Sequence, residues 1–95
     1  MVDIEEKAHI LSYYLLDLPI SEDARKTALR YLEGDEWEEA MVAPVWSLAE
    51  QGIYMPAEVS EVLDFEYFDD EEAKLIRQFA TEDFDYEAHL DLLER

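Results

Sequence analysis

The side chains of this sequence that could do chemistry are almost all carboxylates. The chain holds 26 Asp and Glu, 2 His and no Cys. The lack of cysteine excludes a disulfide, a thiol nucleophile and a thiolate metal site. The sequence contains neither a glycine loop that could cradle phosphate nor a Gly-x-Ser-x-Gly motif. Neighbouring acids such as Asp69 and Asp70 could transfer protons, but proximity means little in so acidic a chain. We therefore expect no enzyme activity.

One run of acids near the C-terminus has the spacing of a calcium-binding loop. Candidate ligands stand at positions 1, 3, 5, 7, 9 and 12 of such a loop: Asp83, Asp85, Glu87, His89, Asp91 and Glu94. Position 6 is Ala88, where the sharp turn of the loop needs glycine. Neither His9 nor His89 has a second histidine at metal-binding spacing. The sequence therefore predicts no metal site and no cofactor.

A long segment without basic residues is the most informative feature of the chain. Between Arg30 and Lys74 there are fourteen Asp and Glu and no Lys or Arg. An ordinary surface helix pairs Glu with Lys four residues later, so solubility alone does not explain this segment. A strongly negative surface attracts basic proteins and repels nucleic acid and anionic lipid. We expect a basic protein partner, with no direct binding to nucleic acid or membranes.

Tyrosines beside carboxylates are the candidate binding residues, because tyrosine supplies contact area and carboxylates attract Arg and Lys. The densest cluster lies at an expected helix junction and comprises Tyr54, Asp64, Glu66, Tyr67, Asp69, Asp70 and Glu71. Glu36 and Glu39 form a second tier. Trp37 and Trp46 are instead expected in the core, since large aromatic residues dominate small cores.

The apolar pattern that must position these residues is helical. Apolar residues recur at steps of three and four along the first segment, at Ile4, Ala8, Leu11, Leu15 and Leu18. This spacing predicts a helix that begins with a capping box of Asp3 and Glu6 and ends at Pro19.

The next two helices meet at a glycine. Ser21 is expected to cap the second helix, whose inner face contains Ala24, Ala28, Tyr31 and Leu32. Gly34 is expected to close it in the left-handed conformation. Asp35 is then the expected N-cap of the third helix, with Glu38 as its capping-box partner.

Proline and glycine divide the middle of the chain. Pro44 is expected to kink the third helix or split it in two, and Gly52 to end it in the left-handed conformation. Pro56 suits the first position of a fourth helix. The segment from Asp64 to Asp70 alternates aromatic and acidic residues, so a short extended piece is possible there.

The C-terminal third is expected to hold two more helices, one capped by Asp69 or Asp70 and running to about Ala80, and one from about Phe84 to Leu93. Glycine and proline number only 2 and 3, which disfavours a β fold with many tight turns. The sequence thus predicts one all-α domain over residues 1–95, a compact bundle of about five to six short helices.

Composition also bears on the compartment. The chain is 49% hydrophobic and 13% aromatic, which favours a folded core over disorder. No apolar stretch approaches the roughly 20 residues of a membrane span, and the first residues lack a signal-peptide pattern. The absence of cysteine is typical of a reducing cytoplasm, and we expect a cytoplasmic protein.

Residues 28–40, followed by Leu48-Ala49-Glu50-Gln51, resemble part of a known family. The helix, the Glu33-Gly34-Asp35 turn and the next helix are similar to those of small helical bacterial immunity proteins, such as the MafI-type proteins of polymorphic toxin systems. The resemblance covers about residues 22–63, and the chain departs from the family at Pro44 and in its very acidic C-terminal third. It implies a cytoplasmic helical protein that neutralises a cognate toxin, without indicating which residues bind.

Three functions are compatible with these features. The first is an inhibitor, an immunity protein or antitoxin, that binds a basic toxin such as a nuclease, whose cleft must attract phosphate. The second is a DNA mimic of the anti-restriction or anti-defence type, which we expect to be elongated. The third is a structural or adaptor subunit whose acids only keep it soluble.

Overall fold

The structure is a computed structural model and describes residues 2–95. Its α-helices are α1 (Ile4–Leu16), α2 (Glu22–Glu33), α3 (Trp37–Gln51), α4 (Val59–Val62) and α5 (Asp70–Phe79). Two 3-10 helices, η1 (Phe65–Tyr67) and η2 (Tyr86–Glu94), and two very short strands, β1 (Met55–Pro56) and β2 (Ala80–Glu82), complete the described part of the chain. The all-α bundle predicted from the sequence is confirmed.

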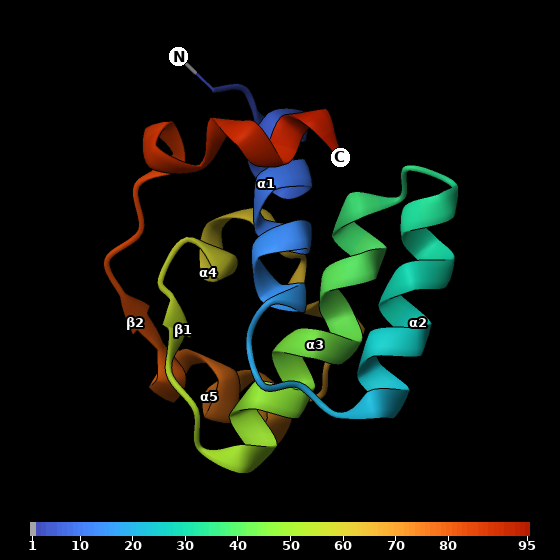
Figure 1. Cartoon of the computed structure of the whole chain (residues 1–95). Coiled ribbons are helices and arrows are strands. Elements are labelled where there is room, and N and C mark those ends of the chain that lie inside the picture. The colour runs from blue at the N-terminus through green and yellow to red at the C-terminus, as the bar shows by residue number, and fades with distance from the viewer. Residues whose placement is uncertain (1) are drawn as a thin grey trace.

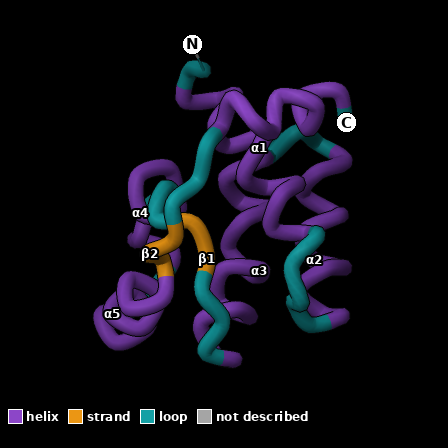
Figure 2. The backbone as a smooth tube through the Cα atoms, turned by 60° about the vertical axis from the view of Figure 1, so that its left-hand side comes forward, coloured by secondary structure: helices purple, strands orange, loops and turns teal. Residues whose placement is uncertain are grey.

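The helices surround α1, which lies near the middle of the molecule (Figure 1). The antiparallel pair α2 and α3 packs on one side of α1, and η2 crosses the end of α1 at which the chain begins. Figure 2 shows the parallel strands β1 and β2 side by side, where Met55 is the partner of Ala80 and Pro56 of Glu82. Within residues 2–95 no helix is sufficiently long and apolar for a membrane crossing.

One hydrophobic core joins these elements. Its fully buried large side chains include Leu11, Leu15, Met41, Val45, Leu48, Met55, Val59 and Ile76. They come from α1, α3, β1, α4 and α5, so α2 is the one α-helix of the described residues that contributes none. The small residues Ala24 and Ala28 bring α2 close to α3 instead, and Leu32 completes its buried stripe.

Local hydrogen bonds set the helix starts, as the sequence predicts. The Asp3 carboxylate accepts a hydrogen bond from Glu6 N at 2.9 Å, and the Glu6 carboxylate accepts one from Asp3 N at 3.1 Å. Asp69 and Glu72 form the same capping box at the start of α5, at 2.8 and 2.9 Å. The Ser21 side chain caps α2 by accepting a hydrogen bond from Ala24 N at 3.1 Å. The capping box of Asp3 and Glu6 and the N-caps at Ser21 and Asp69 are therefore confirmed, whereas the sequence did not predict Glu72 as the capping-box partner of Asp69.

The turn between α2 and α3 differs from the prediction. Gly34 has φ −101°, whereas Asp35 has φ +55° and therefore takes the left-handed position. Glu36, and not Asp35, precedes α3, and no side chain caps that helix. The prediction for Gly34 and Asp35 was wrong by one residue because aspartate also tolerates the left-handed region.

Pro44 does not split the third helix. The helix α3 runs without interruption from Trp37 to Gln51 with Pro44 inside it. An interior proline removes one backbone hydrogen bond and costs about 3 kcal/mol. Here the Pro44 side chain is fully buried, so its packing against the core offsets part of that cost. Gly52 ends α3 with φ +72°, and the predicted left-handed cap is confirmed there.

Two further predictions fail after α3. Pro56 does not begin a helix but lies buried in β1, where its fixed φ is compatible with extended backbone. The segment expected to form a helix from Phe84 to Leu93 is mostly the 3-10 helix η2, with non-helical angles at His89. Consequently Leu90 is 41% exposed, and Leu92 is the buried residue of this segment.

Candidate protein-binding surface

The short helix η1 is tied to the start of α3 by carboxylates. The Asp64 side chain accepts a hydrogen bond from Glu66 N at 2.9 Å and so caps η1. The backbone N–H of Asp64 donates to Glu38 Oε2 at 2.8 Å. Glu38 therefore accepts a hydrogen bond from Asp64 N, and does not form the predicted capping box with Asp35. This link fixes the acidic residues of η1 beside those of α3.

Tyr67 stands among these carboxylates. Its side chain is 47% exposed, and its hydroxyl donates a long hydrogen bond of 3.4 Å to Glu39 Oε1. Partial burial raises the pKa of Tyr67 above its ordinary value of 10.0, and the negative charges of Glu39 and Glu38 raise it further. The phenol therefore lies in a negative local potential, to which an approaching cation is attracted.

A row of adjoining hollows extends from Tyr67 to Tyr31. One, of about 140 Å³, lies between α2, α3 and η1 and is lined by Thr27, Tyr31, Glu39, Val42, Ala43 and Tyr67. A second is lined by Asp64, Glu66 and Tyr67, and a third by Thr27, Arg30, Tyr31 and Glu36. Because neighbouring hollows share Tyr67 or Tyr31, they form one continuous surface. We call it the acidic tyrosine face and define it as Tyr31, Glu36, Glu38, Glu39, Asp64, Glu66 and Tyr67.

Sequence reasoning missed two residues of this face. Tyr31 was expected on the inner side of α2, but it is 39% exposed. Ala24, Ala28 and Leu32 follow the buried stripe, and Tyr31 lies about 100° around the helix from Leu32. Because Tyr31 is also only about 20° from Ala24 around the helix, helical spacing alone could not identify it as exposed. Nothing in the sequence pointed to Glu38 as the acceptor for Asp64 N, because the contact joins residues far apart in the chain.

The predicted acids Asp69, Asp70 and Glu71 follow the face directly along the chain. All three are exposed at the start of α5. Since consecutive Cα atoms are about 3.8 Å apart, Asp69 lies within about 8 Å of Tyr67. Asp69 also caps α5, whereas Asp70 and Glu71 occupy the first helical turn, where negative charge is favoured. These acids extend the negative region beyond η1.

Tyr54 does not join the other predicted residues. It follows Gly52 at the end of α3, while Glu39 lies near the start, and a helix of this length separates the two by roughly 20 Å. The Tyr54 ring is 56% exposed and meets the edge of the Phe79 ring at a centroid distance of 5.3 Å. The structure therefore gathers the predicted site around Tyr67 and leaves Tyr54 outside it.

Few of the carboxylates are neutralised within the molecule. In the described part of the chain a single ion pair is found, between Arg95 and Asp17 at 4.0 Å, and both side chains are exposed. Arg30 lines a hollow beside Glu36, and Arg77 lies over the Phe65 ring at 4.3 Å. The charges of the acidic tyrosine face are thus left for solvent or for a partner.

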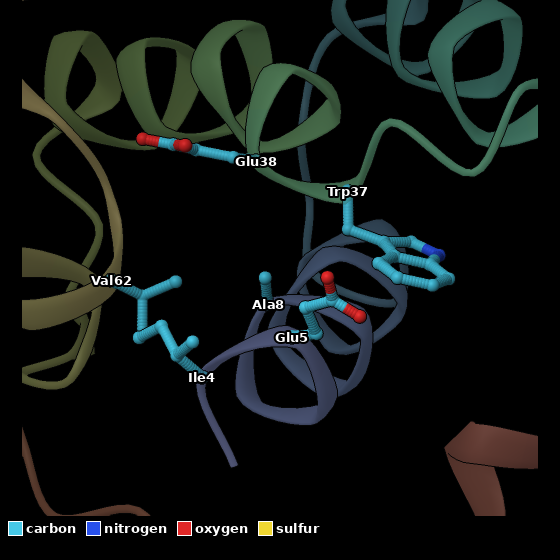
Figure 3. Close-up of a pocket in the computed structure, with 6 residues that line it drawn as sticks. All are labelled: Ile4, Glu5, Ala8, Trp37, Glu38 and Val62. Carbon is cyan, nitrogen blue, oxygen red and sulfur yellow. The ribbon is translucent and has the colours of Figure 1, made fainter.

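A more apolar pocket of about 230 Å³ adjoins this face (Figure 3). It lies between α1, the start of α3 and α4, and is lined by Ile4, Glu5, Ala8, Trp37, Glu38 and Val62. Figure 3 shows Ile4 and Val62 on one side and Glu5 and Trp37 on the other. Trp37 and Trp46, expected in the core, are both only half-buried. The Trp37 ring stacks on the His9 ring, with 4.5 Å between the ring centroids. Ile4, expected on the inner face of α1, is 61% exposed here.

The acid run near the C-terminus does not form a calcium loop. Most of Asp83–Glu94 belongs to η2 and the turn before it, and His89 Nδ1 contacts the backbone oxygen of Asp85 at 3.0 Å. Within residues 2–95 no three His, Asp or Glu side chains are grouped so that they could hold a metal ion.

No protein-family model matches this chain, and neither does any curated protein or solved structure. The resemblance of residues 28–40 to MafI-type immunity proteins therefore stays a prediction. It falls on α2, the turn at Asp35 and the start of α3, three parts that contribute to the acidic tyrosine face. The function has to be inferred from that surface.

Proposed function

We propose that this protein is an inhibitor that binds a basic protein through the acidic tyrosine face. The class we favour is an immunity protein or antitoxin that neutralises a toxin in the cytoplasm. A nuclease toxin is the partner with the best-matched chemistry, because its active site must attract phosphate and is therefore basic. In this proposal the protein itself catalyses no reaction.

The observation that carries the proposal is the arrangement around Tyr67. Two exposed tyrosines from different elements, Tyr31 and Tyr67, border one hollow together with Glu39. Solubility would require scattered charge alone, whereas tyrosine combined with a shaped hollow is typical of binding surfaces. The negative potential that raises the pKa of Tyr67 would favour an incoming Arg or Lys at this place.

Charge and tyrosine would have different roles in binding. The net charge of −19 steers a basic partner and can raise the association rate by a factor of roughly 10 to 1,000. Tyrosine side chains buried in the complex would slow dissociation, since desolvated aromatic anchors dominate interface energies. The two contributions can therefore be separated by kinetics.

The DNA-mimic hypothesis receives less support. It called for an elongated molecule, whereas the radius of gyration is 12.1 Å and the extents are 34 × 26 × 23 Å. A compact chain of this length is expected to have a radius of gyration of about 12 Å. We therefore propose a toxin domain, and not a DNA-binding enzyme, as the partner.

The partner can be identified by purifying the tagged protein from its native host at low and at moderate salt, followed by mass spectrometry. We expect one stoichiometric basic protein that moderate salt releases. A restriction or polymerase component would favour the DNA mimic. If no stoichiometric partner is recovered at either salt concentration, the acidic surface serves solubility and the proposal is wrong.

The kinetic test compares matched charge reversals against the purified partner. Glu66→Lys with Glu71→Lys reverses the charge of the residue before Tyr67 and of a residue in the first turn of α5. Glu33→Lys with Glu87→Lys changes the same total charge elsewhere. We expect the first pair to slow association at least about tenfold and the second to have a much smaller effect. Asp64 and Asp69 are left intact because they cap η1 and α5.

Tyr67→Ala supplies the second part of the test. It should accelerate dissociation at least about tenfold while leaving the association rate within about twofold. Tyr54→Ala is the control, because Tyr54 lies at the other end of α3. Equal effects of the two tyrosine changes, or equal effects of the two charge pairs, would contradict the proposed face.

A further inference from the structure

We infer that the pocket between α1, α3 and α4 receives one arginine side chain of the basic partner. This inference rests on the proposed function, because it assigns a specific anchor beside the acidic tyrosine face. The pocket shares Glu38 with the acidic tyrosine face, and the same Glu38 carboxylate accepts the hydrogen bond from Asp64 N. It was not among the sites that the sequence indicated.

The size and walls of the pocket suit a single side chain. Its volume of about 230 Å³ is below the roughly 300–1,000 Å³ of sites for drug-sized molecules. Ile4, Ala8 and Val62 supply apolar wall, and Ile4 is 61% exposed although it is a large aliphatic residue. The methylene stem of an arginine packs well on such a surface while its charged end stays at the rim.

Two carboxylates provide the matching charge. Glu5 comes from α1 and Glu38 from α3, and both line the pocket. Glu38 is held in place by its hydrogen bond from Asp64 N at 2.8 Å, so its position costs little further ordering when a ligand binds. Figure 3 shows the two carboxylates pointing in different directions, the Glu5 carboxylate toward Trp37 and the Glu38 carboxylate along α3. A guanidinium, with five N–H donors in a planar fork, would therefore bond the Glu5 carboxylate directly and be attracted by the charge of Glu38.

Other occupants match the pocket less well. A lysine ammonium is strongly hydrated and lacks the fork, so it gains less than arginine from an apolar wall and two carboxylates. An uncharged apolar side chain would leave Glu5 and Glu38 partly desolvated without a partner. A second copy of this chain would bring together two molecules of net charge −19, which repel each other strongly.

Trp37 gives the pocket its own spectroscopic signal. The chain has 2 tryptophans, and Trp37 lines this pocket whereas Trp46 borders a different hollow beside Ser47 and Glu50. In a two-dimensional ¹H–¹⁵N spectrum each indole N–H gives one resolved peak, which Trp37→Phe and Trp46→Phe assign. The Trp37 peak reports on the pocket, and the Trp46 peak reports on nonspecific effects.

The experiment titrates the full chain with a blocked Gly-Arg-Gly tripeptide. The two comparison peptides are Gly-citrulline-Gly, which keeps the shape but loses the charge, and Gly-Lys-Gly. We expect the arginine peptide to shift the Trp37 peak saturably with a dissociation constant in the millimolar range. The citrulline and lysine peptides should bind at least about fivefold more weakly, and the Trp46 peak should not move.

Matched variants test the two carboxylates. Glu5→Gln with Glu38→Gln should weaken binding of the arginine peptide about tenfold, because a charge-assisted hydrogen bond to Glu5 and the attraction of the Glu38 charge are both lost. The glutamine at position 38 can still accept the hydrogen bond from Asp64 N, so the fold is kept. Glu33→Gln with Glu87→Gln removes the same charge outside the pocket and should leave the affinity within about twofold.

Several results would overturn the inference. Equal binding of citrulline peptide would show that the pocket recognises only apolar surface, and equal binding of lysine peptide would remove the preference for arginine. Saturating shifts of both indole peaks, or no shift of the Trp37 peak, would exclude a specific pocket. If the pocket fails but Tyr67→Ala still weakens binding of the toxin partner, the proposed function stands without the anchor.

Discussion

At the scale of residues, the carboxylates of this protein divide into those that stabilise helix starts and those that are free to contact a partner. Asp3, Asp64 and Asp69 accept hydrogen bonds from backbone N–H groups and stabilise helix starts. Glu66, the residue before Tyr67, and Glu71, in the first turn of α5, are both exposed and are better placed to meet a partner. Mutating acids without regard to this division would confuse a loss of folding with a loss of binding.

Tyr86 differs from these residues, because its hydroxyl is buried and has no hydrogen-bond partner among the described residues. In residues 2–95 neither the Tyr86 hydroxyl nor Glu58 Oε1 has a hydrogen-bond partner, although both atoms are buried. Burial raises the pKa of Tyr86 from 10.0 to about 12, and the charges of Glu58 and Glu61 contribute to this increase. The folded protein therefore holds this proton more tightly than the unfolded chain.

The sign of the resulting pH dependence follows directly. Below pH 10 the phenol is protonated in both states, and its full contribution to stability is present; it is lost as pH rises toward 12. The parent protein should therefore lose unfolding free energy between pH 10 and pH 12, and Tyr86→Phe should lose about 1 kcal/mol less over the same range. The difference is this small because solvent screens a half-buried group. At pH 7 the variant should be as stable as the parent, or slightly more stable, because an unpaired buried hydroxyl is removed.

Urea unfolding of Tyr86→Phe and of the parent at both ends of this pH range measures the effect. Tyr54→Phe, which changes an exposed tyrosine, is the control and should follow the parent. An identical alkaline loss in Tyr86→Phe would show that the Tyr86 phenol ionises equally easily in the folded and unfolded chain.

At the scale of elements, helix ends follow local backbone chemistry. Gly52 ends α3 with φ +72°, a backbone conformation that residues with a side chain rarely adopt. Gly34 has a negative φ of −101°, which any residue can adopt. A Cβ atom added at either glycine would have similar space. Its nearest neighbour would be Phe79 Cζ at 3.7 Å for Gly52 and Tyr31 O at 3.8 Å for Gly34. The pair therefore separates conformational strain from steric contact.

We expect Gly52→Ala to lower the unfolding free energy by about 1–2 kcal/mol, because the left-handed region is strained for alanine. Gly34→Ala should change the unfolding free energy by less than about 0.5 kcal/mol. Chemical denaturation monitored by circular dichroism measures both. Equal effects would mean that the left-handed conformation at Gly52 is not what limits substitution there.

At the scale of the whole molecule, unbalanced charge is the dominant feature. The net charge is −19 on a molecule with extents of 34 × 26 × 23 Å, and the described residues contain one ion pair. Self-repulsion of this kind destabilises a compact state. It also creates the field that would speed association with a basic partner. Stability and function therefore place opposing demands on the same charges.

Salt should consequently stabilise the folded protein. Raising NaCl from about 10 mM to about 100 mM shortens the Debye length from about 30 Å to about 10 Å, which is less than the width of the molecule. We expect the melting temperature to rise by several degrees over this range. The variant Glu33→Gln with Glu87→Gln should show a smaller rise. A melting temperature that does not change with salt would contradict significant self-repulsion.

Much of this fold could be predicted from local sequence. The capping box at Asp3, the N-caps at Ser21 and Asp69 and the left-handed glycine at Gly52 were all predicted correctly, because each depends on hydrogen bonds or backbone angles within a few residues. Apolar spacing predicted the helices of residues 4–51 and the all-α class. Structural features that depend on residues close together in the chain, such as helix caps and helix positions, could therefore be predicted from the sequence.

The errors arose where distant segments decide the outcome. Pro44 stays in one continuous helix because the core buries its side chain. Pro56 is extended because the segment at Ala80–Glu82 pairs with it. No local pattern encodes either contact.

The sequence by itself determined the chemistry of this protein, namely its many unpaired acids, its tyrosines and its lack of a catalytic motif. The tertiary structure decided which of these residues lie together. It placed Tyr31 beside Tyr67, joined Glu38 to Asp64 and separated Tyr54 from the others. The physical reason is that composition fixes the charge of a chain, whereas a binding surface requires side chains from different helices, and only packing of the core brings those helices together.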